Sequence, residues 1–143
     1  MKKQQNPALG VFDTGTSLQH LISNLVNGSL PVAFDNKTNI VNEVGHGVYI
    51  ENNNEKVVTV MKDLLATVVQ NSNKGDIHIS AERYSDIVVL QIQERNNYNG
   101  YALAFSLMSI ESQINETGGS LSIDGKQKKV ATISYSFPNF AAA

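Results

Sequence analysis

Hydrophobic residues near the start of the chain recur at the spacing of an amphipathic helix, namely Leu18, Leu21, Ile22, Leu25 and Val26. Residues at i, i+3, i+4, i+7 and i+8 share one helical face. The residues from Asp13 to Ser17 include side chains suited to helix N-caps, and Asn27-Gly28 is expected to end the helix. The apolar face has to be covered by the rest of the domain or by a second chain. The Leu18–Val26 helix is therefore a candidate homodimer contact.

The remaining hydrophobic pattern predicts strands and two further helices. Strand patterns cover residues 40–44, 48–50, 77–82, 87–93, 121–123 and 130–137. A stripe of buried positions predicts a long helix from Glu55 to Asn71, and a third helix is expected from about Ala102 to Thr117, with Gly118 as its terminator. This order predicts an α+β fold, a two-layer sandwich in which helices cover one face of a single mixed sheet.

Composition narrows the class of protein. A chain of 143 residues suits one domain with a real core, and its net charge of −2 gives no basic surface for nucleic acid. It has no cysteine, no signal-peptide pattern and no stretch that could span a bilayer, so a cytoplasmic location without membrane contact is expected. The three histidines are scattered and no nucleophile motif is present, so neither a metal site nor a catalytic residue is expected.

The order of elements from Asn39 to Pro138 resembles the ATP-binding domain of sensor histidine kinases, in the GHKL or Bergerat-fold superfamily. The resemblance is most specific at the long helix, at Gly118-Gly119 and at the closing run 134–138. It implies a histidine-kinase-like domain at residues 30–138. A flexible arm at residues 1–12 and the amphipathic helix precede it as residues 1–29, and a short tail follows at 139–143.

The resemblance places a phosphate and metal site on the polar face of the long helix. The family's NLLxNA motif reads Asp63-Leu64-Leu65-Ala66-Thr67-Val68 here, so Asp63 and Thr67 replace the two asparagines. Thr59 and Gln70 lie on the same face of this helix. Gln70 occupies the position where the family usually has a lysine or arginine. A threonine hydroxyl is a poorer oxygen ligand for Mg²⁺ than an amide carbonyl, and Asp63 adds negative charge where a triphosphate would lie. A solvated polar face is the simpler interpretation.

The adenine and phosphate loops also depart from the family. The DxGxG motif reads Glu94-Arg95-Asn96-Asn97-Tyr98, which keeps a carboxylate but loses the glycines. The family's lid, a long glycine-bearing loop that folds over the phosphates, shrinks to a short turn before position 104. The GLGL helix start reads Ala104-Phe105-Ser106-Leu107, and Phe105 is expected to crowd the amides that would bind phosphate.

Two hypotheses follow from these substitutions. The first is a non-catalytic histidine-kinase-like domain that signals through a protein partner, with Asp63, Thr67 and Glu94 as a vestigial nucleotide site and no cofactor. The alternative is a divergent but functional kinase or ATPase domain of a two-component system, which would bind ATP and Mg²⁺ through the same residues. A phosphotransfer protein is a third possibility, disfavoured because only one helix precedes the domain. Either a cavity remains between Asp63 and Glu94, or Arg95, Tyr98 and Phe105 fill it.

Overall fold

The computed structural model describes residues 15–52 and 54–140. The expected flexible arm at residues 1–12 lies outside the described residues. Within them, no helix has the length and apolarity needed to cross a membrane.

A mixed five-stranded sheet forms one layer of the domain. Its order is β2-β4-β5-β7-β6, and the strands are β2 (Asn39–Asn42), β4 (Asp76–Tyr84), β5 (Ile87–Glu94), β7 (Ala131–Pro138) and β6 (Ser120–Asp124). Only β2 and β4 are parallel among these pairs, and the other neighbours are antiparallel. A second, two-stranded sheet pairs β1 (Gly15–Ser17) with β3 (Tyr49–Glu51).

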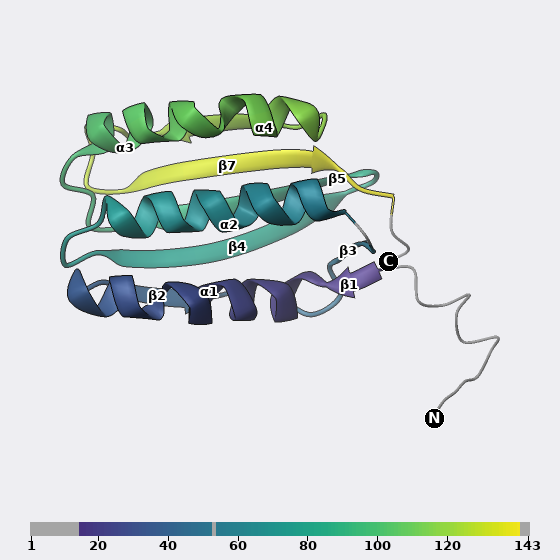
Figure 1. Ribbon diagram of the computed structural model, residues 1–143, viewed down its shortest axis with the longest axis horizontal. Coiled ribbons are helices and arrows are strands. Elements are labelled where there is room, and N and C mark those ends of the chain that lie inside the picture. The colour runs from purple at the N-terminus through teal and green to yellow at the C-terminus, as the bar shows by residue number, and fades with distance from the viewer. Residues whose placement is uncertain (1–14, 53, 141–143) are drawn as a thin grey trace.

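Helices form the second layer and cover one face of the large sheet. They are α1 (Leu18–Asp35), α2 (Glu55–Gln70), α3 (Gly100–Leu107), the 3₁₀ turn η2 (Met108–Ile110) and α4 (Glu111–Glu116). Figure 1 shows them side by side, with α1 over the β2 edge, α2 in the middle and α3–α4 over the β6–β7 side. The predicted α+β sandwich with a mixed sheet is confirmed.

The core lies between these layers and follows the predicted stripes. The apolar face of α2 is buried at Val57, Val60, Met61, Leu64, Leu65 and Val68. On β7 every second side chain is buried, at Ala131, Ile133, Tyr135 and Phe137, because strand residues alternate between faces. Burial raises the pKa of Tyr135 to about 12, so its hydroxyl stays protonated and donates to Thr117 Oγ1 at 2.8 Å.

The predicted end of the first helix at Asn27-Gly28 is wrong. The helix continues to Asp35 with Pro31 inside it, and the expected domain boundary at residues 29/30 falls within it. Tertiary contacts override the local stop signal: Ala33 is buried, and the Asn36 side chain beyond the helix donates to the Val69 carbonyl at 2.9 Å.

The apolar face of α1 is covered by its own domain. Leu18 and Ile22 are buried in the core, and Leu21, Leu25 and Val26 pack against it. Most of the face that suggested a homodimer contact is therefore used within the domain, and a homodimer through it stays a prediction.

Candidate functional site

The polar face of α2 carries Asp63 and Thr67 as expected, but Thr67 is tied to its own helix. Its hydroxyl donates to the Asp63 carbonyl at 2.7 Å, and its own carbonyl accepts from the Asn71 amide at 2.8 Å. The Asp63 carboxylate is half-buried and forms no hydrogen bond or ion pair with another described residue. This face therefore offers one uncommitted carboxylate.

Glu94 lies at the end of β5 with its carboxylate turned into the protein, where it is 3% exposed. The main-chain N–H groups of Asp76 and Asn96 donate to Oε1 at 2.7 and 2.9 Å. The Ser72 hydroxyl lies 2.6 Å from Oε2 and 2.7 Å from the Val68 carbonyl, so its single proton is shared between two acceptors. The carboxylate joins the loop after α2 to the start of β4 and the end of β5.

Gly75 lets the chain pass close to this buried carboxylate. A Cβ atom at position 75 would overlap Glu94 Oε2 and approach Ser72 Cβ to 3.0 Å. The loop and the glutamate therefore fit together only because position 75 has no side chain. Ser72 and Gly75 are site residues that sequence reasoning missed.

The connection between β5 and α3 is short and fastened to the β6–β7 hairpin. The Asn97 main-chain N–H donates to the Lys129 carbonyl at 2.7 Å. Its side-chain amide donates to the carbonyls of Lys126 and Lys128 at 3.2 and 2.9 Å. Where the resemblance implies a lid, the chain makes a turn held against a neighbouring hairpin.

Helix α3 begins earlier than expected, at Gly100 rather than Ala102. Asn99 caps it, because its side-chain oxygen accepts from the Ala102 N–H at 3.1 Å. A Cβ atom at Gly100 would overlap the Lys126 carbonyl oxygen, so the helix start is pressed against the hairpin. The first turn of α3 is thus capped by its own chain.

The expectation that Phe105 crowds the helix start is wrong. Position 105 is in the second turn of α3, and the side chain is 76% exposed. Tyr98 and Arg95 are exposed as well, so none of the three fills a cavity between Asp63 and Glu94. The helices themselves occupy that side of the sheet, since α2 packs directly against α3, η2 and α4.

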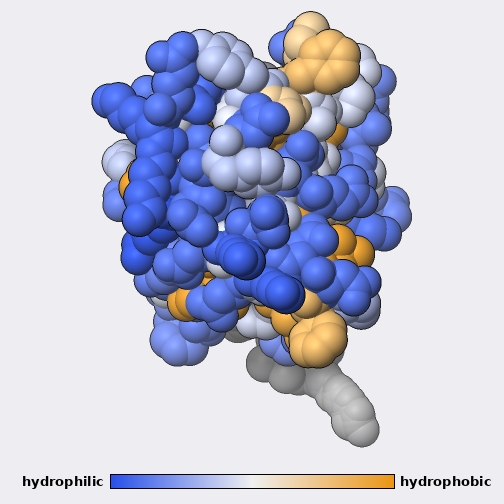
Figure 2. Space-filling model, turned by 90° about the vertical axis from the view of Figure 1, so that its left-hand side faces the viewer, coloured by the Kyte–Doolittle hydropathy of each residue, from blue (hydrophilic) through white to orange (hydrophobic). Residues whose placement is uncertain are grey.

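Grooves border the helices on the described part of the chain. One of about 300 Å³ lies between the start of α2 and α4, one of about 490 Å³ between α1 and α2, and one of about 420 Å³ between α3 and β6. Asp63, Thr67 and Glu94 line none of these three. The end of the molecule where α2 finishes and α3 begins is largely hydrophilic, with scattered hydrophobic spots (Figure 2).

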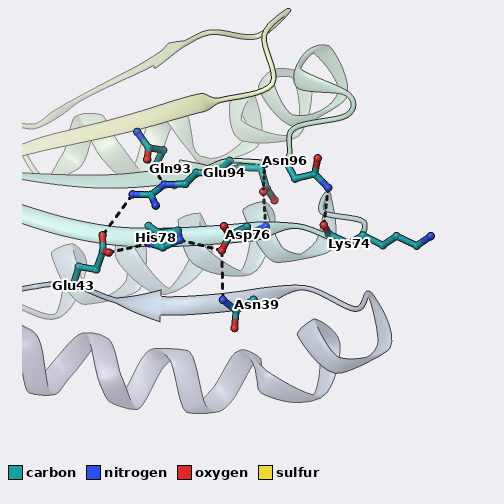
Figure 3. Close-up of polar contacts among 9 residues, drawn as sticks. Asn39, Glu43, Lys74, Asp76, His78, Gln93, Glu94 and Asn96 are labelled. Carbon is teal, nitrogen blue, oxygen red and sulfur yellow. Dashed lines mark hydrogen bonds and ion pairs between the residues drawn. The ribbon is translucent and has the colours of Figure 1, made fainter.

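A second polar cluster lies nearby on the open face of the sheet, on the side of β4 away from the helices (Figure 3). His78 Nδ1 is 3.0 Å from Glu43 Oε2, and His78 Nε2 is 3.0 Å from Asp76 Oδ1. Arg95 approaches Glu43 at 3.9 Å. His78 thus links the segment after β2 to the start of β4. Among the described residues, no group of histidines and carboxylates is arranged to hold a metal ion.

Replacing His78 with alanine is expected to lower the free energy of unfolding by about 1 kcal/mol, because the contacts of its imidazole with the half-exposed carboxylates of Glu43 and Asp76 are lost. Urea unfolding at pH 6 followed by circular dichroism measures the change. His46→Ala is the matched control, since His46 is exposed in a turn. Equal effects of the two substitutions would show that the His78 contacts add nothing to stability.

No protein-family model and no curated protein sequence shows a significant match to this chain. Solved structures do match. Histidine kinase AdeS of Acinetobacter baumannii is 14% identical with a TM-score of 0.71, over 87% of this chain and 66% of AdeS. The catalytic domain of histidine kinase ThkA is 13% identical with a TM-score of 0.66, over 88% of this chain and 95% of that domain.

Two further matching structures contain a bound nucleotide analogue or a partner protein. Full-length ShkA in complex with AMPPNP is 12% identical with a TM-score of 0.71, over 90% of this chain and 32% of ShkA. ThkA also matches in its complex with response regulator protein TrrA, with a TM-score of 0.63. The chain thus spans only part of AdeS and ShkA but nearly all of the ThkA catalytic domain. It has the fold of histidine kinase catalytic domains.

Proposed function

We propose that this chain is a histidine-kinase-like domain that no longer binds ATP and that acts by binding a protein partner. The proposal rests on the buried and internally hydrogen-bonded carboxylate of Glu94. Its carboxylate occupies the position that the resemblance gives to adenine recognition, yet it is 3% exposed and accepts two main-chain N–H groups. An adenine amino group would have to displace those internal donors, and the two freed amides would then lack partners.

The phosphate end of the site supports the same conclusion. Anion binding at a helix start needs accessible N–H groups, but Asn99 caps the first turn of α3 and Gly100 is pressed against Lys126. Thr67 gives its hydroxyl proton to its own helix, and Asp63 would place a negative charge beside the phosphates. The surface at this end has scattered hydrophobic spots, whereas small-molecule sites are lined mainly by apolar groups (Figure 2).

Protein binding is a function that this fold can serve without a nucleotide. ThkA has been captured with response regulator protein TrrA, which shows that a protein with this fold can dock another protein. A response regulator as the partner of this chain is part of the proposal. The packed core of the domain is retained, so a stable surface is available without nucleotide chemistry.

Titration of this chain with ATP and Mg²⁺ is expected to give no binding heat, which corresponds to a dissociation constant weaker than about 1 mM. Isothermal titration calorimetry measures this, with ShkA as the positive control because its structure contains AMPPNP. A dissociation constant in the micromolar range would overturn the proposal in favour of a divergent ATP-binding domain. In that case Glu94→Gln should weaken the binding, since it changes the acceptor without shortening the side chain.

A further inference from the structure

Strand β6 is an unprotected edge of the large sheet. Among the described strands it pairs with β7 alone, in continuous antiparallel register. Alternate main-chain N–H and C=O groups of such a strand point away from the sheet and can pair with another strand. Proteins commonly block edges with charged residues, proline or a bulge, but β6 reads Ser120-Leu121-Ser122-Ile123-Asp124, with no proline, no bulge and a charge only at its last residue. The edge is therefore open to strand addition.

An exposed apolar stripe runs beside this edge. Tyr101, Phe105 and Met108 lie at i, i+4 and i+7 on the α3–η2 segment, and they are 58%, 76% and 64% exposed. Together with Leu121 and Ile123 of β6 they line the groove of about 420 Å³. Aromatic and methionine side chains gathered along an open edge are typical of a protein contact rather than of free surface.

Opposite charges stand at the two ends of the same groove. Lys126 lies at the α3 start, where its Nζ is 6.0 Å from the centre of the Tyr101 ring. Glu111 begins α4, about 16 Å further along the helix at 1.5 Å per residue. Neither residue forms an ion pair with another described residue. A two-fold axis through an antiparallel strand pair reverses the direction of the groove, which brings Lys126 toward the partner's Glu111 end.

We propose that a second copy of this chain docks here, with β6 pairing antiparallel to the partner's β6 and the two α3–η2 stripes covering each other. The sheet would then continue across both copies. Lys126 and Glu111 at the two ends make this surface complementary in charge to a second copy of itself, which favours an identical partner over an unrelated peptide. This contact differs from the dimer expected through the Leu18–Val26 helix, and it does not depend on whether the domain binds nucleotide.

Sedimentation equilibrium of the full chain over a concentration series tests the proposal. We expect a concentration-dependent species of twice the 15.6 kDa chain mass. Phe105→Ser should raise the dimer dissociation constant at least about tenfold, because it removes an aromatic contact at the centre of the interface. Phe34→Ser is the matched control: Phe34 is 84% exposed on α1, on the opposite side of the molecule, and its loss should leave the dimer unchanged.

A charge exchange tests the two-fold arrangement. Lys126→Glu and Glu111→Lys should each weaken the dimer, whereas the double variant, or a mixture of the two single variants, should restore it. Thermal melting of each variant checks that the fold is kept. A chain that stays monomeric at every concentration would overturn the proposal and leave the edge to a different partner. A dimer that responds to Phe34→Ser but not to Phe105→Ser would overturn it too.

Discussion

Replacing Glu94 with alanine is expected to lower the free energy of unfolding by about 4 kcal/mol, because the main-chain N–H groups of Asp76 and Asn96 lose their acceptor in a buried place. The substitution also leaves a cavity beside Ser72 and Gly75. Urea unfolding at pH 7, followed by circular dichroism, measures the change. The variant is expected to keep its helices in the absence of urea but to unfold at a much lower midpoint.

Two control variants separate the buried carboxylate from a general effect of charge. Glu116→Ala removes an exposed glutamate and should change stability by less than about 0.5 kcal/mol. Glu94→Gln keeps one acceptor oxygen and should fall between the two. If Glu94→Ala were as mild as Glu116→Ala, the carboxylate would be free to serve a ligand. The proposal that it is committed to the fold would then be wrong.

Replacing Gly100 with alanine is expected to destabilise the protein by about 3 kcal/mol, because the added methyl group would overlap the main-chain oxygen of Lys126. A main-chain atom cannot swing aside as a flexible side chain can, so α3 and the β6–β7 hairpin have to move apart. The same urea experiment measures the loss. Hydrogen exchange of the amides at 97 and 102 should also become faster, because their partners are displaced.

Gly28→Ala provides the matched control for this prediction. Gly28 lies inside α1, and a Cβ atom there would meet nothing within 4 Å. Alanine is favoured over glycine in a helix interior by about 0.8 kcal/mol, so this substitution should stabilise the protein. A loss of stability at both positions would show that the close approach at Gly100 is not the cause.

Periodicity was sufficient to predict the strands of the large sheet and the α2 stripe, but not β1 or its separate pairing with β3. The predicted elements are long and their buried residues recur regularly, so burial and local pattern agree. The ends of α1 and α3 could not be predicted in the same way. Asn27-Gly28 is a local stop signal that the contacts of Ala33 and Asn36 override, and the start of α3 depends on a cap at Asn99 and on a hairpin more than twenty residues away.

The candidate site was only partly predictable. The resemblance identified Asp63, Thr67 and Glu94 as residues of a candidate nucleotide site. The sequence alone could not show that Glu94 turns inward, because sheet pairing brings Asp76 to it and the loop after α2 brings Ser72.

The fastening of Asn97 to the β6–β7 hairpin has a consequence for how the domain could carry a signal. A nucleotide drives a switch only if it binds one of two conformations more tightly, and a closing loop usually supplies those two conformations. Here the corresponding turn is held against the β6–β7 hairpin by three hydrogen bonds of Asn97, which would have to break before it could close over a ligand. Under the proposed function, the output of the domain would therefore depend on its concentration and would change with synthesis, degradation or competition for the partner.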